Sequence, residues 1–389
     1  MRRLAALLPA VVAACALAVP AAAQEPLRDV VFVANAEGGT VTVVDAETFE
    51  VVHEIDVLPD GPDATLGEDA PLQALVGQRV VELAGGKNYA QDQDVSPDGR
   101  TLYVSRGHRG DVAAFDIASG RMLWKLPVNS LRADHMTLSG DGRRLYVSAL
   151  TSNRVQVVDT QRRAFVGEFP TGEWPHDNHL SHDGERIYNA SIGNIVIPPE
   201  MRALLAPLLE PYVLTVVDAQ TLAPRERHVF DAGIRPFVLT GDETRMYAQL
   251  SLFHGIVEYD LEAGRPLRQV QLPIDPGVTE DDFDFEAPHH GLALSPDGGT
   301  LCAAGRASDY VALVSTATMQ PDAIIDVGDA PGWAANGPGG SHCFVPNTRE
   351  GTLSVISYAG RAEVARVPVG HGPKHLEAAQ VPESVLAGS

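Results

Sequence analysis

A short motif recurs along most of the chain and limits the fold more than any other feature. It begins with a turn sequence such as SPDG and runs into a segment rich in Tyr and Val. The position that Tyr103 occupies in the first full copy recurs after 43, 42, 59, 55 and 42 residues. The two long spacings equal one repeat of about 42 residues plus an insertion. The copies are SPDGRTLYVSR (96–106), SGDGRRLYVSA (139–149), SHDGERIYNAS (181–191), TGDETRMYAQL (240–250), SPDGGTLCAAG (295–305) and the degenerate GPGGSHCFVPN (337–347).

Each repeat is typical of four short antiparallel strands. Residues 133–170 contain a strand that ends in LSGDG, followed by RLYVSA, VQVVDT and AFVGEFP. Apolar and polar residues alternate in these segments, and turn residues separate them. In SPDG, Pro fixes φ and Gly tolerates positive φ, so the tetrapeptide suits a tight turn. Four-stranded units at this spacing predict an all-β fold, a β-propeller.

The two ends of the chain predict a closed ring of seven blades. Residues 28–57 supply only three strands, which correspond to b, c and d of a blade. Residues 372–382 supply an isolated strand a. Joining them would complete blade 1 and pair two otherwise exposed sheet edges. We therefore expect one propeller over 24–382, with 383–389 as a C-terminal tail.

The repeats resemble those of the YVTN-type β-propeller family, which is related to the haem d1 domain of nitrite reductase. This resemblance covers nearly all of 28–382 and implies the propeller fold. It implies little about function, because such propellers act in binding, as scaffolds and in catalysis. The matching segments are FVAN (32–35), SPDGRTLYVS (96–105), LSGDGRRLYVS (138–148) and SPDG (295–298).

The first 23 residues are typical of a secretory signal peptide. Arg2 and Arg3 precede an apolar stretch, and small residues lead to a predicted cleavage site after Ala23. We therefore expect a periplasmic or secreted protein. A lipoprotein modified at Cys15 is the alternative. No other apolar segment is long enough to predict a transmembrane span.

The charge balance limits the partners. The chain has 29 Lys and Arg against 51 Asp and Glu, a formal charge of −22. Like charges repel, which excludes nucleic acid and anionic membranes as expected partners. We expect a monomer that binds a small molecule or an envelope protein.

Three insertions are predicted to lie on one face of the ring, here called the upper face. Residues 58–90 and 275–288 each connect strand d of one blade to strand a of the next, and 194–211 connect strands b and c. Strands alternate in direction, so these connections all leave the face opposite the SPDG turns. Long loops on one face of a rigid scaffold commonly carry a binding site. The acidic segment 279–286 is either a calcium loop or a solvated loop.

Polar residues precede or begin most of the predicted strands a, at the inner rim of the upper face. They predict a polar funnel that binds a ligand. The structural alternative is a hydrated channel in which these polar groups only satisfy hydrogen bonds of the backbone. The candidate ligand-binding residues are Asp92, Asp134, His135, His176, Asp177, His179, Arg235, His289, His290, Lys374 and His375.

A divalent metal is a candidate cofactor of this funnel. Its proposed ligands are His135, His176 and His290, which come from different blades. His176 and His179 are three residues apart on one strand, so they are expected to face opposite sides. A metal site would therefore have to be assembled from several blades.

Two functions fit these residues. The first is an exported binding module that presents the funnel to a ligand or a protein. The alternative is an enzyme, either a metal-dependent lactonase- or lyase-type propeller or a redox protein holding a metal or tetrapyrrole. The sequence contains no P-loop, dinucleotide fingerprint or nucleophile elbow. Whether the protein is an enzyme stays open.

Cys302 and Cys343 occupy equivalent strands of neighbouring repeats and are offset by one residue. The offset places their side chains on opposite faces of the two sheets. The sequence leaves open whether they form a disulfide or are small buried residues.

Overall fold

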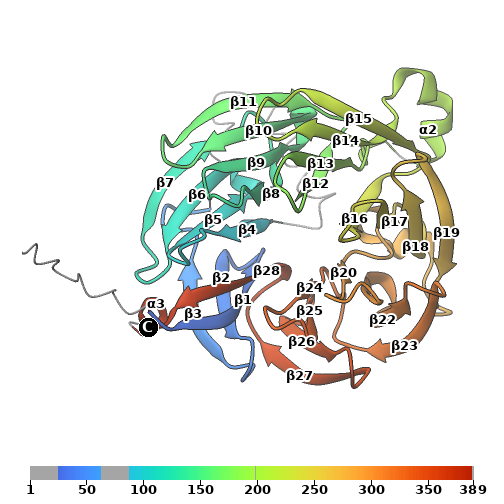
Figure 1. The fold of residues 1–389 in the computed structure, drawn as a ribbon. Helices are drawn as coiled ribbons and strands as arrows, with labels where there is room; N and C mark the ends of the chain where they lie inside the picture. The colour runs from blue at the N-terminus through green and yellow to red at the C-terminus, as the bar shows by residue number, and fades with distance from the viewer. Residues whose placement is uncertain (1–24, 63–86, 198, 388–389) are drawn as a thin grey trace, which may run out of the picture.

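Seven four-stranded antiparallel sheets are arranged around a central axis (Figure 1). The computed structural model describes residues 25–62, 87–197 and 199–387. The predicted all-β, seven-bladed propeller is confirmed. The signal segment and most of the first insertion lie outside the described residues. Within the described ranges, no helix is long and apolar enough to cross a membrane.

In each blade the strands run from the axis outwards in the order a, b, c, d. Blades 1 to 4 contain β28 (Pro373–Pro382), β1 (Leu27–Asn35), β2 (Thr40–Asp45), β3 (Val51–Asp56); β4 (Asp92–Val95), β5 (Thr101–Arg106), β6 (Asp111–Asp116), β7 (Met122–Pro127); β8 (Ala133–Leu138), β9 (Arg144–Ala149), β10 (Arg154–Asp159), β11 (Ala164–Pro170); and β12 (Pro175–Leu180), β13 (Arg186–Ser191), β14 (Tyr212–Asp218), β15 (Pro224–Phe230).

Blades 5 to 7 follow the same order. They contain β16 (Ile234–Leu239), β17 (Arg245–Leu250), β18 (Gly255–Asp260), β19 (Arg265–Gln271); β20 (Leu292–Leu294), β21 (Thr300–Gly305), β22 (Tyr310–Ser315), β23 (Gln320–Asp326); and β24 (Ala335–Asn336), β25 (His342–Asn347), β26 (Thr352–Ser357), β27 (Ala362–Pro368).

Blade 1 is closed by the two ends of the chain, as predicted. The C-terminal strand β28 pairs antiparallel with β1, from Leu27 opposite Pro382 to Asn35 opposite Pro373. The short helix α3 (Glu383–Leu386) then packs Val385 and Leu386 into the core shared by blades 1 and 2. The ring therefore depends on contacts between the first and last strands of the described chain.

The SPDG turns are held by their own side chains. In the first copy the Ser96 hydroxyl donates to Asp98 Oδ1 at 2.6 Å, and the same oxygen accepts the Arg100 N–H at 3.1 Å. Gly99 has φ of 66°, and a Cβ there would lie 2.8 Å from the Gln380 carbonyl oxygen of β28. The motif therefore fixes both a turn and the approach of blade 2 to blade 1.

Cys302 in β21 and Cys343 in β25 form a disulfide, with a Cα–Cα distance of 6.6 Å. Their one-residue offset explains why they meet. Neighbouring blades pack face to face, so side chains on opposite sheet faces point into the same interface. The bond links the inner b strands of blades 6 and 7, and both cysteines are buried.

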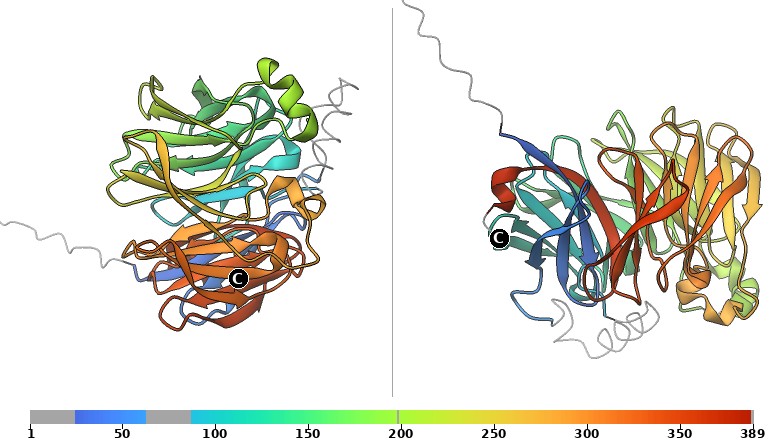
Figure 2. Two further views of the ribbon diagram at one scale, coloured as in Figure 1. Left: turned by 90° about the vertical axis from the view of Figure 1, so that its right-hand side faces the viewer. Right: turned by 90° about the horizontal axis from the view of Figure 1, so that it is seen from below.

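The described parts of the insertions lie on one face of the ring (Figure 2). The second insertion contains α2 (Pro199–Leu205) and η3 (Ala206–Leu208), and the third contains η4 (Glu280–Asp282) and η5 (Asp284–Glu286). An ion pair joins them, with Arg202 Nη2 2.7 Å from Glu286 Oε1. Two carboxylates of the acidic loop, Asp284 and Glu286, pair with arginines, and Asp284 accepts from both Arg306 and Arg349. A third, Asp282, accepts from Thr279 within the loop. This arrangement does not favour a calcium loop.

Further 3-10 turns border the same face in the b–c connections. These are η1 (Gly107–Arg109), η2 (Leu150–Ser152) and η6 (Arg306–Ser308).

Candidate functional site

The strands a bring polar side chains from all seven blades to the axis, where they form three layers. The upper pocket lies beneath the insertions. The histidine belt, defined as Asp92, His135, Trp333 and His375, crosses the axis below it. The lower vestibule lies towards the SPDG turns.

The upper pocket is a small cavity of 40 Å³ with a cationic side and an apolar side. That volume has room for about three water-sized groups, so it can hold the polar end of a small molecule. The apolar wall comes mainly from b–c connections and the third insertion. The lining residues are Gln91, Arg132, Asp134, Leu150, Trp174, His176, Ile192, Ile195, Arg235, Phe285, His290 and Lys374.

Arg235, in β16, is one of the most deeply buried charged groups of the molecule, with 1% of its surface exposed. Its Nε donates to the Ser251 hydroxyl at 3.0 Å, and Nη2 donates to the carbonyl of Phe285. Glu286 lies 3.8 Å from Nη2. Burial lowers the pKa of Arg235 to about 10, so the guanidinium is charged at neutral pH.

Lys374 reaches the same pocket from β28. Its ammonium lies 4.8 Å from the ring centroid of Phe285, a cation–π contact. Burial lowers its pKa to about 7, and repulsion by Arg132 and Arg306 acts in the same direction. Lys374 and Phe285 also line a second cavity of 160 Å³ nearer the surface. The upper pocket therefore continues outwards past these two side chains.

Asp134 organises the floor of the upper pocket. Its Oδ1 accepts from Arg132 Nε at 3.3 Å, and its Oδ2 accepts from His176 Nδ1 at 2.9 Å. Burial alone would raise the pKa of Asp134, but Arg132 and His176 hold it well below the usual range. Arg132 also donates to Gln91 Oε1 at 2.7 Å. Asp134 is therefore an ionised carboxylate with fixed partners.

Two imidazoles meet at the edge of this pocket. His176 Nε2 lies 3.3 Å from His290 Nε2, and His290 Nδ1 donates to the Gly332 carbonyl at 2.8 Å. Burial lowers the pKa of His176 to about 4, and repulsion by His135 acts in the same direction. Burial also lowers the pKa of His290 well below its usual value. Both rings are therefore neutral at pH 7.

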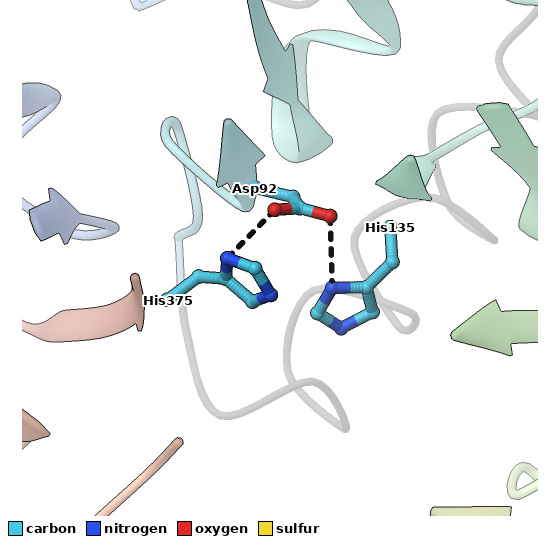
Figure 3. A group of neighbouring side chains, drawn as sticks. All are labelled: Asp92, His135 and His375. Atoms are coloured by element: carbon cyan, nitrogen blue, oxygen red, sulfur yellow. Dashed lines mark hydrogen bonds and ion pairs between the residues drawn. The ribbon is translucent and has the colours of Figure 1, made fainter. Parts of the chain in front are cut away.

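The histidine belt is centred on Asp92 (Figure 3). The carboxylate of Asp92 lies 2.7 Å from His375 Nδ1 and 3.2 Å from His135 Nδ1. It also accepts the backbone N–H groups of Gln93 and Met136.

The belt also crosses the channel. The His135 ring stacks on Trp333 of blade 7, with centroids 5.0 Å apart. The His375 ring packs against the same indole, with ring centroids 4.1 Å apart. Because side chains of opposite blades meet here, the belt separates the upper pocket from the lower vestibule.

The lower vestibule is larger, at 390 Å³, and acidic. Asp177 Oδ2 lies 3.1 Å from His179 Nε2. Burial and the charges of Glu377 and Asp92 raise the pKa of Asp94 well above its usual value. Burial and Asp92 also raise the pKa of Glu377 to about 8. This end of the channel therefore binds protons at neutral pH.

Glu377→Gln tests this charge balance. The folded-state pKa is raised, so folding retains a proton that the unfolded chain loses above about pH 4.5. Stability should therefore fall as pH rises from about 4.5 to 8 and then level off. Because Glu377 is partly exposed, we expect the variant to gain only about 1–2 kcal/mol at pH 8 and almost nothing at pH 5. Thermal melts at both pH values measure this, and an equal gain at the two would contradict it.

The structure separates the predicted residues into groups. Asp134, His176, Arg235, His290 and Lys374 line the upper pocket. Asp92, His135 and His375 belong to the belt, and Asp177 and His179 line the lower vestibule. His176 and His179 face different compartments, as their spacing predicts.

His289 does not join the funnel. Its Nε2 lies 3.1 Å from His254 Nδ1 and 3.2 Å from the Tyr310 hydroxyl, between blades 5 and 6. It lines none of the cavities of the described channel. The prediction that His289 binds a ligand is therefore corrected: His289 is a buried residue packed between two blades.

The predicted metal trio is brought together only in part. His135 and His176 are adjacent, with ring centroids 4.4 Å apart, and His176 contacts His290. Among the described residues, the compact groups of three candidate ligands are Asp92, His135, His375 and Asp134, His135, His176. Neither group contains His290.

Sequence reasoning missed Gln91, Arg132 and Phe285. Gln91 and Arg132 immediately precede strands a. The other rim residues were identified by the same position, so including one or two more residues before each strand would have found these two. Phe285 lies in the third insertion, where a backbone φ of 55° directs the residue towards the pocket that it lines. No sequence pattern indicates that bend.

Comparisons with known proteins agree with the fold. Residues 22–166 match the family model "Lactonase, 7-bladed beta-propeller", which is less than half of the chain. No curated protein matches the sequence. Among solved structures, Kuenenia stuttgartiensis hydrazine synthase is similar, with a TM-score of 0.62, 19% identity, and coverage of 84% of this chain and 92% of that chain.

A Bacteroides fragilis protein described as a 6-phosphogluconolactonase is also similar. It has a TM-score of 0.64 and 12% identity, over 93% of this chain and 100% of that chain. At these identities the structural likenesses support the propeller fold alone.

Proposed function

We propose that this propeller binds a small organic carboxylate in the upper pocket. The supporting observation is that three cationic side chains from three different blades, Arg132, Arg235 and Lys374, line one small cavity. Asp134 is the one carboxylate among its described lining residues, and it already accepts from Arg132 and His176. The pocket therefore has positive charge left for a ligand.

The shape of the pocket fits the same ligand class. A carboxylate would occupy the cationic end, because guanidinium and ammonium groups bind such anions with charge-assisted hydrogen bonds. A short apolar chain would lie against Trp174, Ile192 and Phe285. Additional polar groups could continue past Lys374 into the outer cavity, which Arg306 and Arg349 also line.

Calorimetric titration with propionate, 3-bromopropionate and gluconate tests the proposal, with propionamide as the uncharged control. We expect one site per chain for the acids and none for the amide. Arg235→Met should weaken binding about 10- to 100-fold, the usual loss for a buried charged hydrogen bond. The matched control Arg154→Met removes an exposed guanidinium of β10 and should leave the affinity unchanged. Equal affinities for acid and amide would reject the proposal.

Lys374 gives the binding a pH dependence. The group is charged below its pKa of about 7 and neutral above it. A bound carboxylate favours the charged form, so affinity should fall as pH rises, by about tenfold from pH 6 to pH 8. Titrations at the two pH values measure this. Lys374→Met should bind weakly and with no such slope, and a slope that persists in this variant would contradict the assignment.

Lactone hydrolysis is the second candidate, and the match of residues 22–166 to the lactonase family model favours it. His176 is neutral and oriented by Asp134, the arrangement of a general base. Water would attack the lactone carbonyl and lose its proton to His176 Nε2. The ring C–O bond would then break, the leaving oxygen would take a proton, and a hydroxycarboxylate would remain beside the three cations.

A pH-stat assay with glucono-1,5-lactone and γ-butyrolactone tests this candidate. If the protein hydrolyses either lactone, His176→Gln should lower the rate at least 100-fold. The matched control His289→Gln removes an adjacent buried imidazole outside the pocket and should retain activity. Rates equal to the buffer alone would reject lactone hydrolysis without bearing on carboxylate binding.

We also propose that the protein is exported to the periplasm or beyond. The basic start, the apolar stretch and the small residues before Gln24 support this. N-terminal sequencing of protein isolated from its host should begin at Gln24. A retained Met1 would contradict export, and a lipid-modified Cys15 would favour the lipoprotein alternative.

A further inference from the structure

We propose that His176 and His290 bind a first-row transition-metal ion of the Zn²⁺ or Cu²⁺ type through their two Nε2 atoms, at the edge of the upper pocket. The inference goes beyond carboxylate binding and does not depend on it. It concerns a site formed by β12 of blade 4 and the segment before β20 of blade 6.

The hydrogen bonds of the two rings fix which nitrogen carries the proton. His176 Nδ1 faces Asp134 Oδ2 at 2.9 Å, and His290 Nδ1 faces the Gly332 carbonyl at 2.8 Å. The Asp134 carboxylate, which also accepts from Arg132, has no proton to donate. The Gly332 carbonyl is likewise an acceptor only. Each Nδ1 therefore carries its ring's proton, and each Nε2 presents a lone pair.

The two lone pairs face each other across 3.3 Å. Both side chains are at least nine-tenths buried, with 5% and 4% of their surfaces exposed. Two acceptors at this distance in a poorly hydrated site repel unless something that accepts electron pairs lies between them. A metal ion is one such group, and a single shared proton is the other.

The separation suits a metal. Two imidazole nitrogens about 2.0–2.1 Å from a tetrahedral ion lie about 3.4 Å apart. The outer partners fit as well, because histidines that bind metals usually donate their other N–H to a carboxylate or a carbonyl. His176 and His290 show one of each. Nitrogen ligands favour zinc and copper over magnesium and calcium.

A cation bound here would need anionic partners, because positive groups surround the pair. His135 and Arg235 act on His176, and Lys374 and Arg306 act on His290, while Asp134 offsets part of this charge. The remaining coordination positions would open on the upper pocket, since both histidines line it. Hydroxide or a carboxylate could occupy them and balance the ion's charge.

The group formed by Asp92, His135 and His375 is less suited to a metal, although its three candidate ligand atoms lie within 4.8 Å of one another. Its carboxylate lies against two ring Nδ1 atoms and accepts two backbone N–H groups. A metal there would have to displace these hydrogens. In the His176–His290 pair no hydrogen needs to be displaced.

The test uses metal alone, without any carboxylate, so its result is separate from that of the proposed function. Tag-free full-length protein is stripped with chelator and titrated with ZnCl₂ in a non-coordinating buffer, with MgCl₂ and CaCl₂ as controls. We expect one Zn²⁺ per chain and no comparable uptake of Mg²⁺ or Ca²⁺. His290→Gln should weaken Zn²⁺ binding at least tenfold, and Asp134→Asn should weaken it about 10- to 100-fold.

Two controls keep the test decisive. His289→Gln, next in the chain and equally buried, should bind Zn²⁺ as the wild type does. Anomalous diffraction from Zn²⁺-soaked wild-type crystals covers the case in which His290→Gln fails to fold. A peak about 2.0–2.1 Å from both Nε2 atoms would support the site. No peak there, a peak at Asp92, or unchanged Zn²⁺ affinity in folded His290→Gln would overturn it.

Discussion

A chain that ends at Gly372 is expected to lose the native fold altogether. The deletion removes β28, which is the innermost strand of blade 1 and pairs with β1 along its whole length. It would expose the buried residues of β1, including Phe32 and Val33, and leave an unpaired edge beside the channel. A propeller distributes its stability around a closed ring, so loss of one inner strand affects both neighbouring blades.

Size-exclusion chromatography and thermal melts measure this outcome. The truncated chain should aggregate or elute as an expanded species without a cooperative melt. A matched control that ends at Leu386 keeps α3 and should melt as the full chain does. A Gly372-terminated chain with the native elution volume and melting temperature would show that ring closure is unnecessary.

Replacing both Cys302 and Cys343 by Ala is expected to cost the second-largest amount of stability. The bond closes a loop with a sequence separation of 41. By the loop-entropy relation, its loss corresponds to about 4 kcal/mol. For a chain of this length that shift equals about 5 °C in melting temperature. Alanine suits the test because both positions are buried and apolar.

Melts of the double variant and of the wild type, each with and without reductant, provide the measurement. The double variant should be insensitive to reductant. Equal melting temperatures for wild type and variant under oxidising conditions would mean that the ring already restrains blades 6 and 7 without the bond. The two single variants should be as unstable as the double, since either leaves the bond unmade.

The blades could be predicted from the sequence because each repeat carries its own strand and turn signals. The SPDG copies locate every a–b turn, and the incomplete ends at 28–57 and 372–382 locate the closure. The disulfide could not be decided, because it depends on how the faces of two blades meet. The one-residue offset between Cys302 and Cys343 becomes informative only once their sheets are packed together.

The site could be predicted as a ring of residues but not as three layers. His289 and His290 illustrate the difficulty, since they are adjacent and both precede a strand. Gly291 has φ of 154°, and a Cβ there would lie 2.4 Å from the Trp333 backbone. This close approach, which only glycine permits, turns His290 towards the axis and leaves His289 between blades. Strand alternation cannot anticipate it, because β20 begins only at Leu292.

The belt has a similar explanation. His135, His375 and Trp333 come from blades 3, 1 and 7, and their contacts depend on the diameter of the ring. A repeat pattern gives the number of blades but not the side-chain packing at the axis. The division of the channel into two compartments therefore required the structure.

The central claim is that the upper pocket holds the carboxylate of a small organic ligand. Diffraction from wild-type crystals soaked in 3-bromopropionate tests it most directly, because bromine locates the ligand by its anomalous signal. We predict a bromine peak in the upper pocket, with the carboxylate between Arg132, Arg235 and Lys374, and no such peak in Arg235→Met crystals. An empty upper pocket in the wild type, with bromine in the lower vestibule or nowhere, would contradict the claim.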